Sequence, residues 1–486
     1  MAAAALALYL PLLALGAIAV WRRPLLALYA FVAGLALHNL AMALLYDAGV
    51  RGAALTAVAA WKEVLLGVAL VSAALPSLRA RRLPFAPGAV DALALAFAAV
   101  VGVYALVPQD VLGGSAGAGA IAHGVRHALA PVGAYLLGRV LALGADDLRR
   151  LAAAVVGVAV AVAGFGLVEL YAVSLDWWRS SGAPGWYREQ LGLEYRGLSG
   201  LPENFVYNPG DERPLRRLVS TFLSPLASAY LFVVALLVLA ARPWRTRWLL
   251  APAAPIVAAL LLTHTRAAFL ALAGGLLVLA AVSWSAWPVA GALATLVLGA
   301  AILVVYQDVA PRTSFTPAEL RVQRENARRA GDTDHGAFDP DEPSLASHWR
   351  SLRDGAETVA RHPQGYGPGN AGTVARRFDE RSRAGESSYA ELGVQLGIVG
   401  LLLFVAWNAA LLLALARGAG EPLAAGLAAA LGAVLALAVQ TDVLGVPWLA
   451  FVLWGLGGAA ARSRPVPEAG IVQDMSTLRT DVARGG

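Results

Sequence analysis

The chain has 486 residues, of which 58% are hydrophobic and 14% are charged. Because soluble domains carry about 25% charged residues, this chain lacks the charge to cover a soluble surface. The composition therefore excludes a cytosolic enzyme, a disordered tail protein and a fibrous repeat, and it predicts an integral membrane protein. The net charge of +6 comes from arginines and the single Lys62, and in short loops such charge sets topology rather than attracting nucleic acid. The absence of cysteine excludes disulfides and thiolate nucleophiles.

The apolar segments predict an all-α, polytopic bundle of about 12–13 transmembrane helices, because each span needs about 20 mostly apolar residues. In chain order the candidate spans are residues 2–20, 24–45, 53–75, 88–107, 119–140, 150–174, 219–240, 248–263, 266–283, 287–306, 388–416, 421–440 and 445–461. The first segment has no preceding charge and is followed by a basic pair, which is typical of a span rather than of a cleaved signal peptide. No internal repeat is visible, and this disfavours an inverted-repeat transporter.

Arginines in alternate short loops predict the orientation of the bundle. They are Arg22, Arg23, Arg79, Arg81, Arg82, Arg149, Arg150, Arg242, Arg245, Arg247 and Arg417, with Arg462 and Arg464 opening the C-terminal tail. The opposite set of loops is nearly free of arginine. Because positive charge is retained in the cytoplasm, the arginine-rich loops and the tail are predicted to be cytoplasmic, and the N-terminus is predicted to lie outside.

Two loops are too long to be simple connectors, and both fall on the predicted outer side. Within the second, the spacing of apolar residues at 318–330 and 344–361 predicts helices. The predicted organisation is 1–174 N-terminal spans, 175–218 an aromatic and arginine-rich loop, 219–306 central spans, 307–387 a large, partly helical loop, 388–461 C-terminal spans and 462–486 a disordered tail.

The first polar motif, RRLVSTFLSP at 216–225, lies where the first long loop enters the membrane. Guanidinium groups at such an interface suit a diphosphate, because they donate paired hydrogen bonds and stay charged, and the hydroxyl of Thr221 lies a helical turn further on. The alternative for Arg216 and Arg217 is snorkelling of interfacial arginines toward the lipid headgroups.

The second motif is Thr263-His264-Thr265-Arg266, a polar group between two apolar spans on the same side. Its arginine again matches anion binding at a membrane boundary. The alternative is a polar turn that caps two helices.

The third motif is RHPQGYGPGN at 361–370, in which glycines alternate around a proline. Such a loop exposes backbone N–H groups that are able to hold anionic oxygens. It is not a P-loop, because the lysine and its hydroxyl neighbour are absent, and an ordinary turn is the alternative for this segment and its His362, Gly367 and Asn370.

The fourth motif, GESSYAELGVQLGIVG at 385–400, begins the return helix. Glu386, Tyr389 and Gly393 share one helical face by their spacing. A carboxylate at this position is a candidate general base if nearby arginines and burial tune it. The alternative is that Glu386 caps the helix N-terminus, where the helix dipole favours an acid.

Ionisable residues also occur inside candidate spans, where they indicate function. His123, Arg126 and His127 lie one turn apart in the fifth candidate span, but without an HExxH pattern they favour a packing or proton role over a metal site. Lys62 with Glu63, and Glu169, are candidate ion-pair partners within the bundle. No cofactor or metal site is predicted.

Taken in order, these motifs resemble the O-antigen ligase and O-antigen polymerase superfamily of polytopic bacterial membrane glycosyltransferases, over about residues 200–461. The resemblance implies a metal-independent enzyme that needs no cofactor and uses a sugar chain on a polyprenyl (undecaprenyl) diphosphate as donor. It implies that Arg217 and Arg266 bind the donor diphosphate and that 365–370 shapes the loop against donor or acceptor. The weaker substrate-binding candidates are Arg216, Thr221, His264, His362, Gly367, Asn370 and Tyr389.

The sequence departs from the family pattern at one position. Ligases carry a His-Asn pair before the LGIVG glycine, and the matching place, eleven residues before Gly397, holds Glu386 followed by Ser387. A glutamate can still accept the proton of an acceptor hydroxyl, so Glu386 is the predicted catalytic base. The change favours a polymerase-like enzyme over a ligase.

The predicted function is therefore transfer or polymerisation of an oligosaccharide from a lipid-diphosphate donor to a saccharide or glycolipid acceptor. The predicted place is the outer face of the bacterial inner membrane, with the bilayer as a partner and without nucleic acid. Trp177, Trp178, Trp186 and Tyr187 of the first loop either stack on sugars or anchor at the interface. The alternatives are a non-enzymatic flippase for lipid-linked oligosaccharide, which predicts charges spread along a central cavity, and an envelope scaffold protein.

Overall fold

The computed structural model describes residues 2–141, 143–208, 213–242, 250–330 and 343–461. The ordered elements in these ranges are almost all helices, and the strands form one short antiparallel pair, β1 (Val206–Tyr207) and β2 (Leu215–Arg216). The prediction of an all-α, polytopic fold is therefore confirmed. The predicted disordered tail, residues 462–486, lies outside the described residues.

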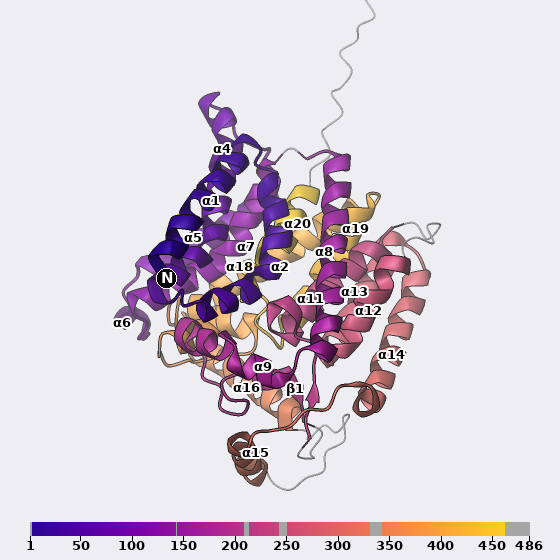
Figure 1. The fold of residues 1–486 in the computed structure, drawn as a ribbon. Coiled ribbons are helices and arrows are strands. Elements are labelled where there is room, and N and C mark those ends of the chain that lie inside the picture. The colour runs from indigo at the N-terminus through magenta and orange to yellow at the C-terminus, as the bar shows by residue number, and fades with distance from the viewer. Residues whose placement is uncertain (1, 142, 209–212, 243–249, 331–342, 462–486) are drawn as a thin grey trace, which may run out of the picture.

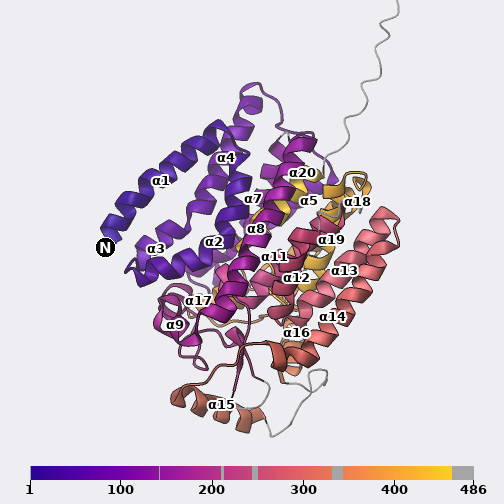
Figure 2. The same ribbon diagram turned by 45° about the vertical axis from the view of Figure 1, so that its right-hand side comes forward.

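Eight helices in the described part of the chain are long and apolar enough to cross a membrane (Figures 1 and 2). They are α1 (Ala2–Arg22), α2 (Leu26–Asp47), α3 with α4 (Gly52–Ala59 and Trp61–Arg79), α5 (Ala89–Leu106), α8 (Ala145–Ala172), α13 (Arg266–Ser283), α14 (Trp287–Val309) and α18 (Ser388–Arg417). Large apolar side chains on the outer helices remain uncovered, for example Leu8 and Val304 at 69% exposure each. Such exposure is expected where the surrounding solvent is lipid.

The remaining predicted spans also coincide with helices. Four are short apolar helices, α11 (Pro225–Ala240), α12 (Leu250–Leu262), α19 (Pro422–Leu437) and η5 with α20 (Leu449–Leu453 and Trp454–Ala460). The other is α7 (Ala118–Val140), which carries the histidines and arginine noted in the sequence. α11 packs against α8, α12, α13 and α19, and nearly all its residues are buried, so it forms the centre of the bundle.

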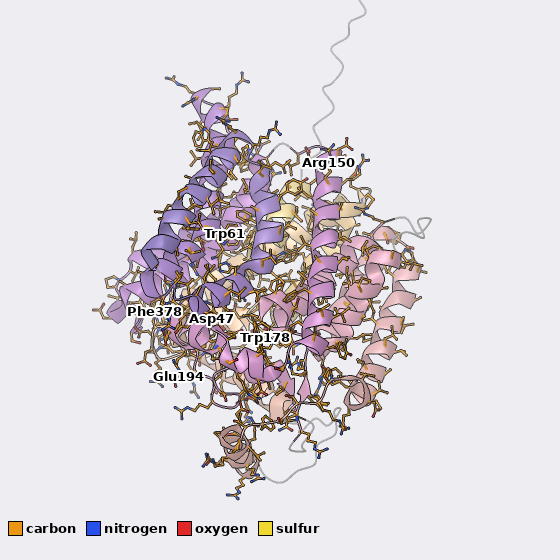
Figure 3. The ribbon with its side chains drawn as sticks, in the orientation of Figure 1. Asp47, Trp61, Arg150, Trp178, Glu194 and Phe378 are labelled. Atoms are coloured by element: carbon orange, nitrogen blue, oxygen red, sulfur yellow. The ribbon has the colours of Figure 1, made fainter. Side chains whose placement is uncertain are left out.

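The two ends of the bundle differ in character (Figures 1 and 3). One end, here called the arginine end, carries Arg150 and the C-terminal end of α4. The opposite end, here called the loop end, carries Trp178 and Glu194, and it holds the two long connections. The elements of these connections and of the shorter loops at that end are α6 (Gln109–Leu112), α9 (Leu175–Ser180), α10 (Ala183–Gly185), η1 (Trp186–Gln190), η2 (Glu203–Phe205), η3 (Ser220–Phe222), α15 (Pro317–Ala330), α16 (Pro343–Arg361) and α17 (Gly372–Arg377).

Two helices that enter the bundle from the loop end begin at serine caps. The Ser224 side chain accepts a hydrogen bond from Ala227 N, and the next residue is a proline at the first helical position of α11. The Ser387 side chain accepts from Ala390 N at the start of α18. Both caps satisfy backbone donors that have no partner within a helix, so the chain can turn sharply into the apolar layer.

α18 is broken at Gly397, which has φ 66° and ψ −176°. The break frees the carbonyls of Val394 and Gln395, and these accept hydrogen bonds from Tyr366 N (2.7 Å) and Gly367 N (2.9 Å). On the other side of the break, Ile398 N donates to the carbonyl of Pro363 (2.8 Å). The glycine-rich segment 361–370 is thus threaded against the broken helix, where it replaces the missing helical hydrogen bonds.

A buried ion pair fixes the first long connection to α8. Arg216, at the end of β2, donates to the Glu169 carboxylate and to the carbonyl of Val173 (2.9 Å). The indole of Trp178 donates to the same carboxylate at 2.7 Å. The Arg216 and Glu169 side chains are both almost fully buried, so each charge depends on the other.

The break in α18 predicts that Gly397→Ala is destabilising. An added Cβ would lie 2.6 Å from the carbonyl oxygen of Pro363, and the positive φ is unfavourable for alanine. We expect a loss of about 1–3 kcal/mol of unfolding free energy, seen as a lower melting temperature in detergent. The control is Gly164→Ala in α8, where an added Cβ meets nothing within 4 Å. Equal melting temperatures for the two variants would contradict a role for the break.

The ion pair predicts that Glu169→Gln destabilises the protein, because it leaves the Arg216 charge buried without a carboxylate. We expect a loss of about 3–5 kcal/mol, measured by thermal or denaturant unfolding in detergent. Asp146→Asn on the same helix is the matched control, since Asp146 pairs with Arg149 in the open, and its loss should stay below about 1 kcal/mol. A Glu169 variant as stable as this control would show that the buried pair contributes nothing.

Candidate functional site

The first two predicted motifs come together at the turn between α12 and α13. Arg217 Nε donates to the Thr263 carbonyl at 2.9 Å, and its Nη2 lies 3.2 Å from the His264 carbonyl and 3.2 Å from the Thr265 hydroxyl. Burial, together with the nearby charge of Arg266, lowers the pKa of Arg217 to about 10. The guanidinium is thus committed to oxygens of the protein, so in this conformation it holds the turn that begins α13. Arg266 is the first residue of that helix.

The neighbours of Arg217 in these motifs are also engaged within the protein. The His264 ring packs against the rings of Tyr207 (4.3 Å) and Tyr306 (4.1 Å), and burial next to two arginines lowers the pKa of His264 to about 3. It is therefore neutral near pH 7. The buried hydroxyl of Thr221 donates to the Ala36 carbonyl at 2.6 Å. Together with the Arg216 ion pair, these contacts favour a structural role for the polar groups in these motifs.

The glycine-rich segment is packed rather than open. Besides the bonds of Tyr366 and Gly367 to α18, Gly369 N donates to the Gln395 side chain at 2.9 Å. The Asn370 side chain donates to the Gln109 side chain (2.7 Å) and to two carbonyls of its own loop. The predicted row of N–H donors is therefore largely used in holding the loop against α18.

His362 is held in the same way. Its Nε2 lies 2.8 Å from the Leu112 carbonyl, and its ring stacks on Tyr366 with centroids 3.8 Å apart. The first contact holds the start of the glycine-rich segment against the end of α6, and the second is made within the segment.

Glu386 lies in the loop just before α18, where α16 packs against that helix. Its carboxylate is 2.8 Å from His348 Nδ1 on α16, and this hydrogen bond lowers the pKa of Glu386 below its ordinary value. The side chain is 42% exposed. Tyr389, one turn later, donates its hydroxyl to the Leu435 carbonyl at 2.9 Å. Glu386 is thus an ionised, partnered acid at the loop end.

A polar cavity reaches into the bundle from the loop end. It consists of two adjoining parts of about 240 and 310 Å³. The residues that line both parts are Lys62, His123, Arg126, Leu191, Arg377, Gly445 and Pro447. We call this space the cationic chamber. Neither Glu386 nor Arg217 lines it.

The lining of the cationic chamber carries an excess of positive charge. Lys62 and Arg126 share one carboxylate, that of Glu63, at 3.6 and 3.4 Å. The Arg377 side chain, on α17, forms no hydrogen bond or ion pair with another residue in the described ranges, although it is partly buried. Burial and the nearby Arg126 lower the pKa of Arg377. Three cations against one carboxylate make this chamber the strongest candidate for binding an anion.

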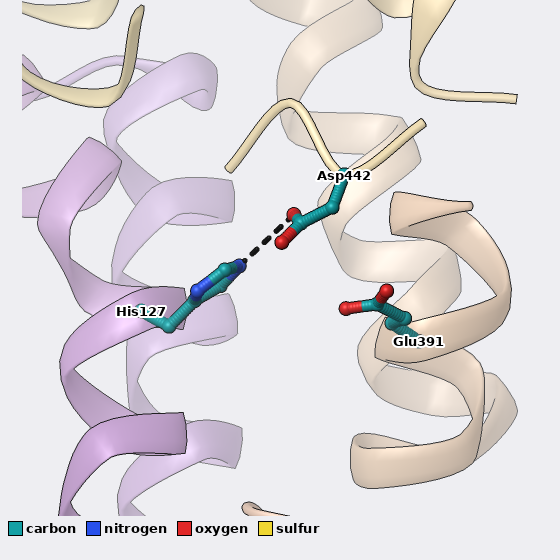
Figure 4. A group of neighbouring side chains, drawn as sticks. All are labelled: His127, Glu391 and Asp442. Carbon is teal, nitrogen blue, oxygen red and sulfur yellow. Dashed lines mark hydrogen bonds and ion pairs between the residues drawn. The ribbon is translucent and has the colours of Figure 1, made fainter. Parts of the chain in front are cut away.

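His127, which lines the chamber, forms a cluster with Asp442 and Glu391, two acids that do not themselves line it (Figure 4). His127 Nε2 lies 3.2 Å from Asp442 Oδ1, and Gly445 N donates to the same oxygen at 2.9 Å. Burial raises the pKa of the Asp442 carboxyl, but His127 and the N–H groups of the following loop outweigh it, so the pKa of Asp442 lies below its ordinary value.

The same three side chains are the group of described residues that comes closest to a metal site. Their nearest donor atoms lie within 4.8 Å of one another. Ligands of one tetrahedral zinc ion at 2.0–2.1 Å are about 3.3 Å apart, so this spacing fits a hydrogen-bonded pair with a neighbouring acid better than a set of ligands.

Sequence reasoning identified part of this site. It singled out Lys62, Glu63, Arg126 and His127 as ionisable residues within spans, but it had no signal that joined α4, α7 and α17. It missed Arg377, Glu391 and Asp442, because their importance comes from neighbours that are distant in sequence. One signal could have identified them: an ionisable residue at the end of an apolar helix is costly unless it is paired, so each such residue is a candidate for a site.

Comparison with known proteins finds a similarity in the second half of the chain. Residues 251–405 match a family model described as O-antigen ligase. No curated protein matches the chain. The matched region runs from α12 into α18 and contains the Thr263–Arg266 turn, the large connection, the glycine-rich segment and Glu386. This chain is a multi-pass membrane protein in which residues 251–405 are similar to the O-antigen ligase family.

Proposed function

We propose that the protein is a glycosyltransferase of the bacterial inner membrane that works at the outer face. It transfers an oligosaccharide from a polyprenyl-diphosphate-linked donor to a saccharide or glycolipid acceptor. The observation that carries the proposal is the cationic chamber, which opens among the loop-end segments of a chain with an O-antigen ligase family region. The arginine end faces the cytoplasm in this proposal, as the positive-inside rule predicts.

The lining of the chamber suits a diphosphate leaving group. Arginine presents a planar set of donors that matches phosphate oxygens, and Arg377 is free of competing acids in the described part of the chain. Lys62 and Arg126 add positive charge a short distance away. Fixed cations that are already in place stabilise the charge that develops on the diphosphate as the sugar leaves. The lipid tail would remain in the bilayer while the headgroup enters the chamber.

The aromatic residues of the first long connection support a place for sugar. Trp186, Tyr187 and Tyr195 line the larger part of the chamber, next to the amides of Gln190 and Asn204. Flat apolar faces beside hydrogen-bonding groups are typical of saccharide recognition. By contrast, the indole N–H of Trp178 is bound to Glu169, which favours a structural role for that residue.

Arg217 and Arg266, both predicted to bind the donor diphosphate, receive different roles in this proposal. The Nε and Nη2 donors of Arg217 are already bonded to Thr263, His264 and Thr265, so a diphosphate that took these donors would displace those bonds. We therefore assign Arg217 to shaping the start of α13. Arg266 remains a candidate for contact with the donor, and it is not needed to explain the charge of the chamber.

The proposal leans toward a polymerase-like enzyme. This preference rests on the replacement of the family histidine by Glu386, as the resemblance implies, and the acceptor is then the growing chain on a second lipid carrier. A ligase would instead accept a single addition to a glycolipid. The same assay distinguishes both from a flippase.

The purified protein in vesicles should convert a polyprenyl-diphosphate-linked oligosaccharide into product. We expect a ladder of longer chains from donor alone, detected on a gel, if the enzyme is a polymerase. One addition to an added acceptor would indicate a ligase. Movement of the donor across the bilayer without any product would contradict the proposal and favour the flippase.

Replacement of Arg377 tests the chamber. We expect Arg377→Ala to lower kcat/KM for transfer by about 100-fold, because one donor to the developing diphosphate charge is lost. Arg377→Lys should recover part of the rate, since it restores the charge without the planar fork.

The control is Arg149→Ala, which removes a 73% exposed arginine at the other end of the bundle and should leave the rate unchanged. A folded Arg377→Ala protein with the same kcat/KM as this control would rule the chamber out as the diphosphate site.

A further inference from the structure

The His127–Asp442 pair joins α7 to the loop after α19, and His127 lines the space where we place the donor. We infer that His127 is the general base that takes the proton of the acceptor hydroxyl, and that Asp442 positions its ring. The inference rests on the proposed function and gives a specific catalytic role to a histidine that lies outside the four loop motifs.

The geometry gives the two ring nitrogens of His127 different roles. Nε2 is 3.2 Å from Asp442 Oδ1, so in the neutral ring it carries the proton and donates to the carboxylate (Figure 4). Nδ1 then holds the lone pair, and no residue in the described ranges forms a hydrogen bond with it. Gly445 N fixes Asp442 from the other side. A histidine held by a carboxylate through one nitrogen and open at the other is the arrangement used for general-base catalysis.

The charged groups around His127 come from five elements. Arg126 lies next to it on α7, Lys62 and Glu63 lie on α4, Arg377 on α17, Asp442 on the loop after α19, and Glu391 on α18. The pKa of Asp442 lies below its ordinary value, so this carboxylate is ionised and would stabilise the imidazolium formed when His127 takes a proton.

Glu386 is less suited to this step in the present conformation. It is bound to His348, and it does not line the chamber that holds Arg126 and Arg377. His127 lines the same wall as those cations. A base must lie within hydrogen-bonding reach of the hydroxyl that attacks beside the leaving diphosphate, and His127 meets this condition if the diphosphate binds there.

The step is balanced without any further reactant. The acceptor oxygen forms a bond with the anomeric carbon of the donor sugar, and the bond from that carbon to the diphosphate oxygen breaks. The electron pair of the broken bond leaves with polyprenyl diphosphate. The hydroxyl proton passes to His127 Nδ1 and is released to water before the next turnover.

The test compares full-length variants in the transfer assay described above. We expect His127→Gln to lower kcat by about 100- to 10,000-fold, because glutamine can bond to Asp442 but cannot act as a base. The KM for the donor and the melting temperature should stay close to the wild-type values. The control is Arg149→Ala, which removes an exposed arginine at the arginine end of the bundle. Its rate should stay unchanged.

Chemical rescue separates a base from a packing residue. Imidazole added to His127→Ala should raise kcat by at least about tenfold and should not stimulate the wild-type protein, because it supplies the missing base. Asp442→Asn should lower kcat while the KM for the donor stays unchanged, as expected for a residue that only positions the base.

The outcomes distinguish a failure of the proposed function from a failure of the role assigned to His127. A wild-type protein without transfer activity would contradict the proposed function itself. An active wild-type protein with a His127→Gln rate within threefold of it would overturn only the role of His127. Loss of rate in Glu386→Gln with retention in His127→Gln would assign the base to Glu386 instead. A folded His127→Ala protein that imidazole does not rescue would also overturn the inference.

Discussion

An ionisable side chain inside an apolar helix bundle must find a partner in the protein or must face water, because an unpaired buried charge is costly. Arg216 meets this condition through Glu169, and Arg217 meets it through the carbonyls at the start of α13. Arg377 pairs with no described group and meets the condition by facing the cationic chamber. The difference separates arginines that hold the fold from one that is free to bind an anion, although the sequence motif that contains Arg217 is the more conspicuous.

Backbone carbonyls inside the bundle must likewise find hydrogen-bond donors, and this requirement positions the segments that form the chamber. The break at Gly397 leaves carbonyls that the glycine-rich segment must satisfy, so that segment is drawn between α7 and α18. α17 follows it directly and presents Arg377 to the chamber. Gly372, at the start of α17, lies so close to the Glu391 carboxylate that a Cβ there would collide with it. The broken helix and the site are therefore parts of one arrangement.

The sequence predicted the parts of the fold that depend on local composition. Apolar runs of sufficient length mark the helices, and the spacing in 318–330 and 344–361 anticipates α15 and α16. The cluster around His127 was beyond such reasoning, because His127 and Asp442 are 315 positions apart and meet only through packing. An arginine motif also does not show which groups of the folded protein accept hydrogen bonds from its arginines. Nothing in the sequence around Arg217 shows that the Thr263–Thr265 turn occupies its donors.

The central claim is that the donor diphosphate binds in the cationic chamber. A structure of the full chain with bound polyprenyl diphosphate tests it most directly. The account predicts that the diphosphate lies within hydrogen-bonding distance of Arg377, with Arg126 and Lys62 nearby and Arg217 still bonded to Thr263. A diphosphate bound by Arg217 and Arg266, with the chamber unoccupied, would contradict it.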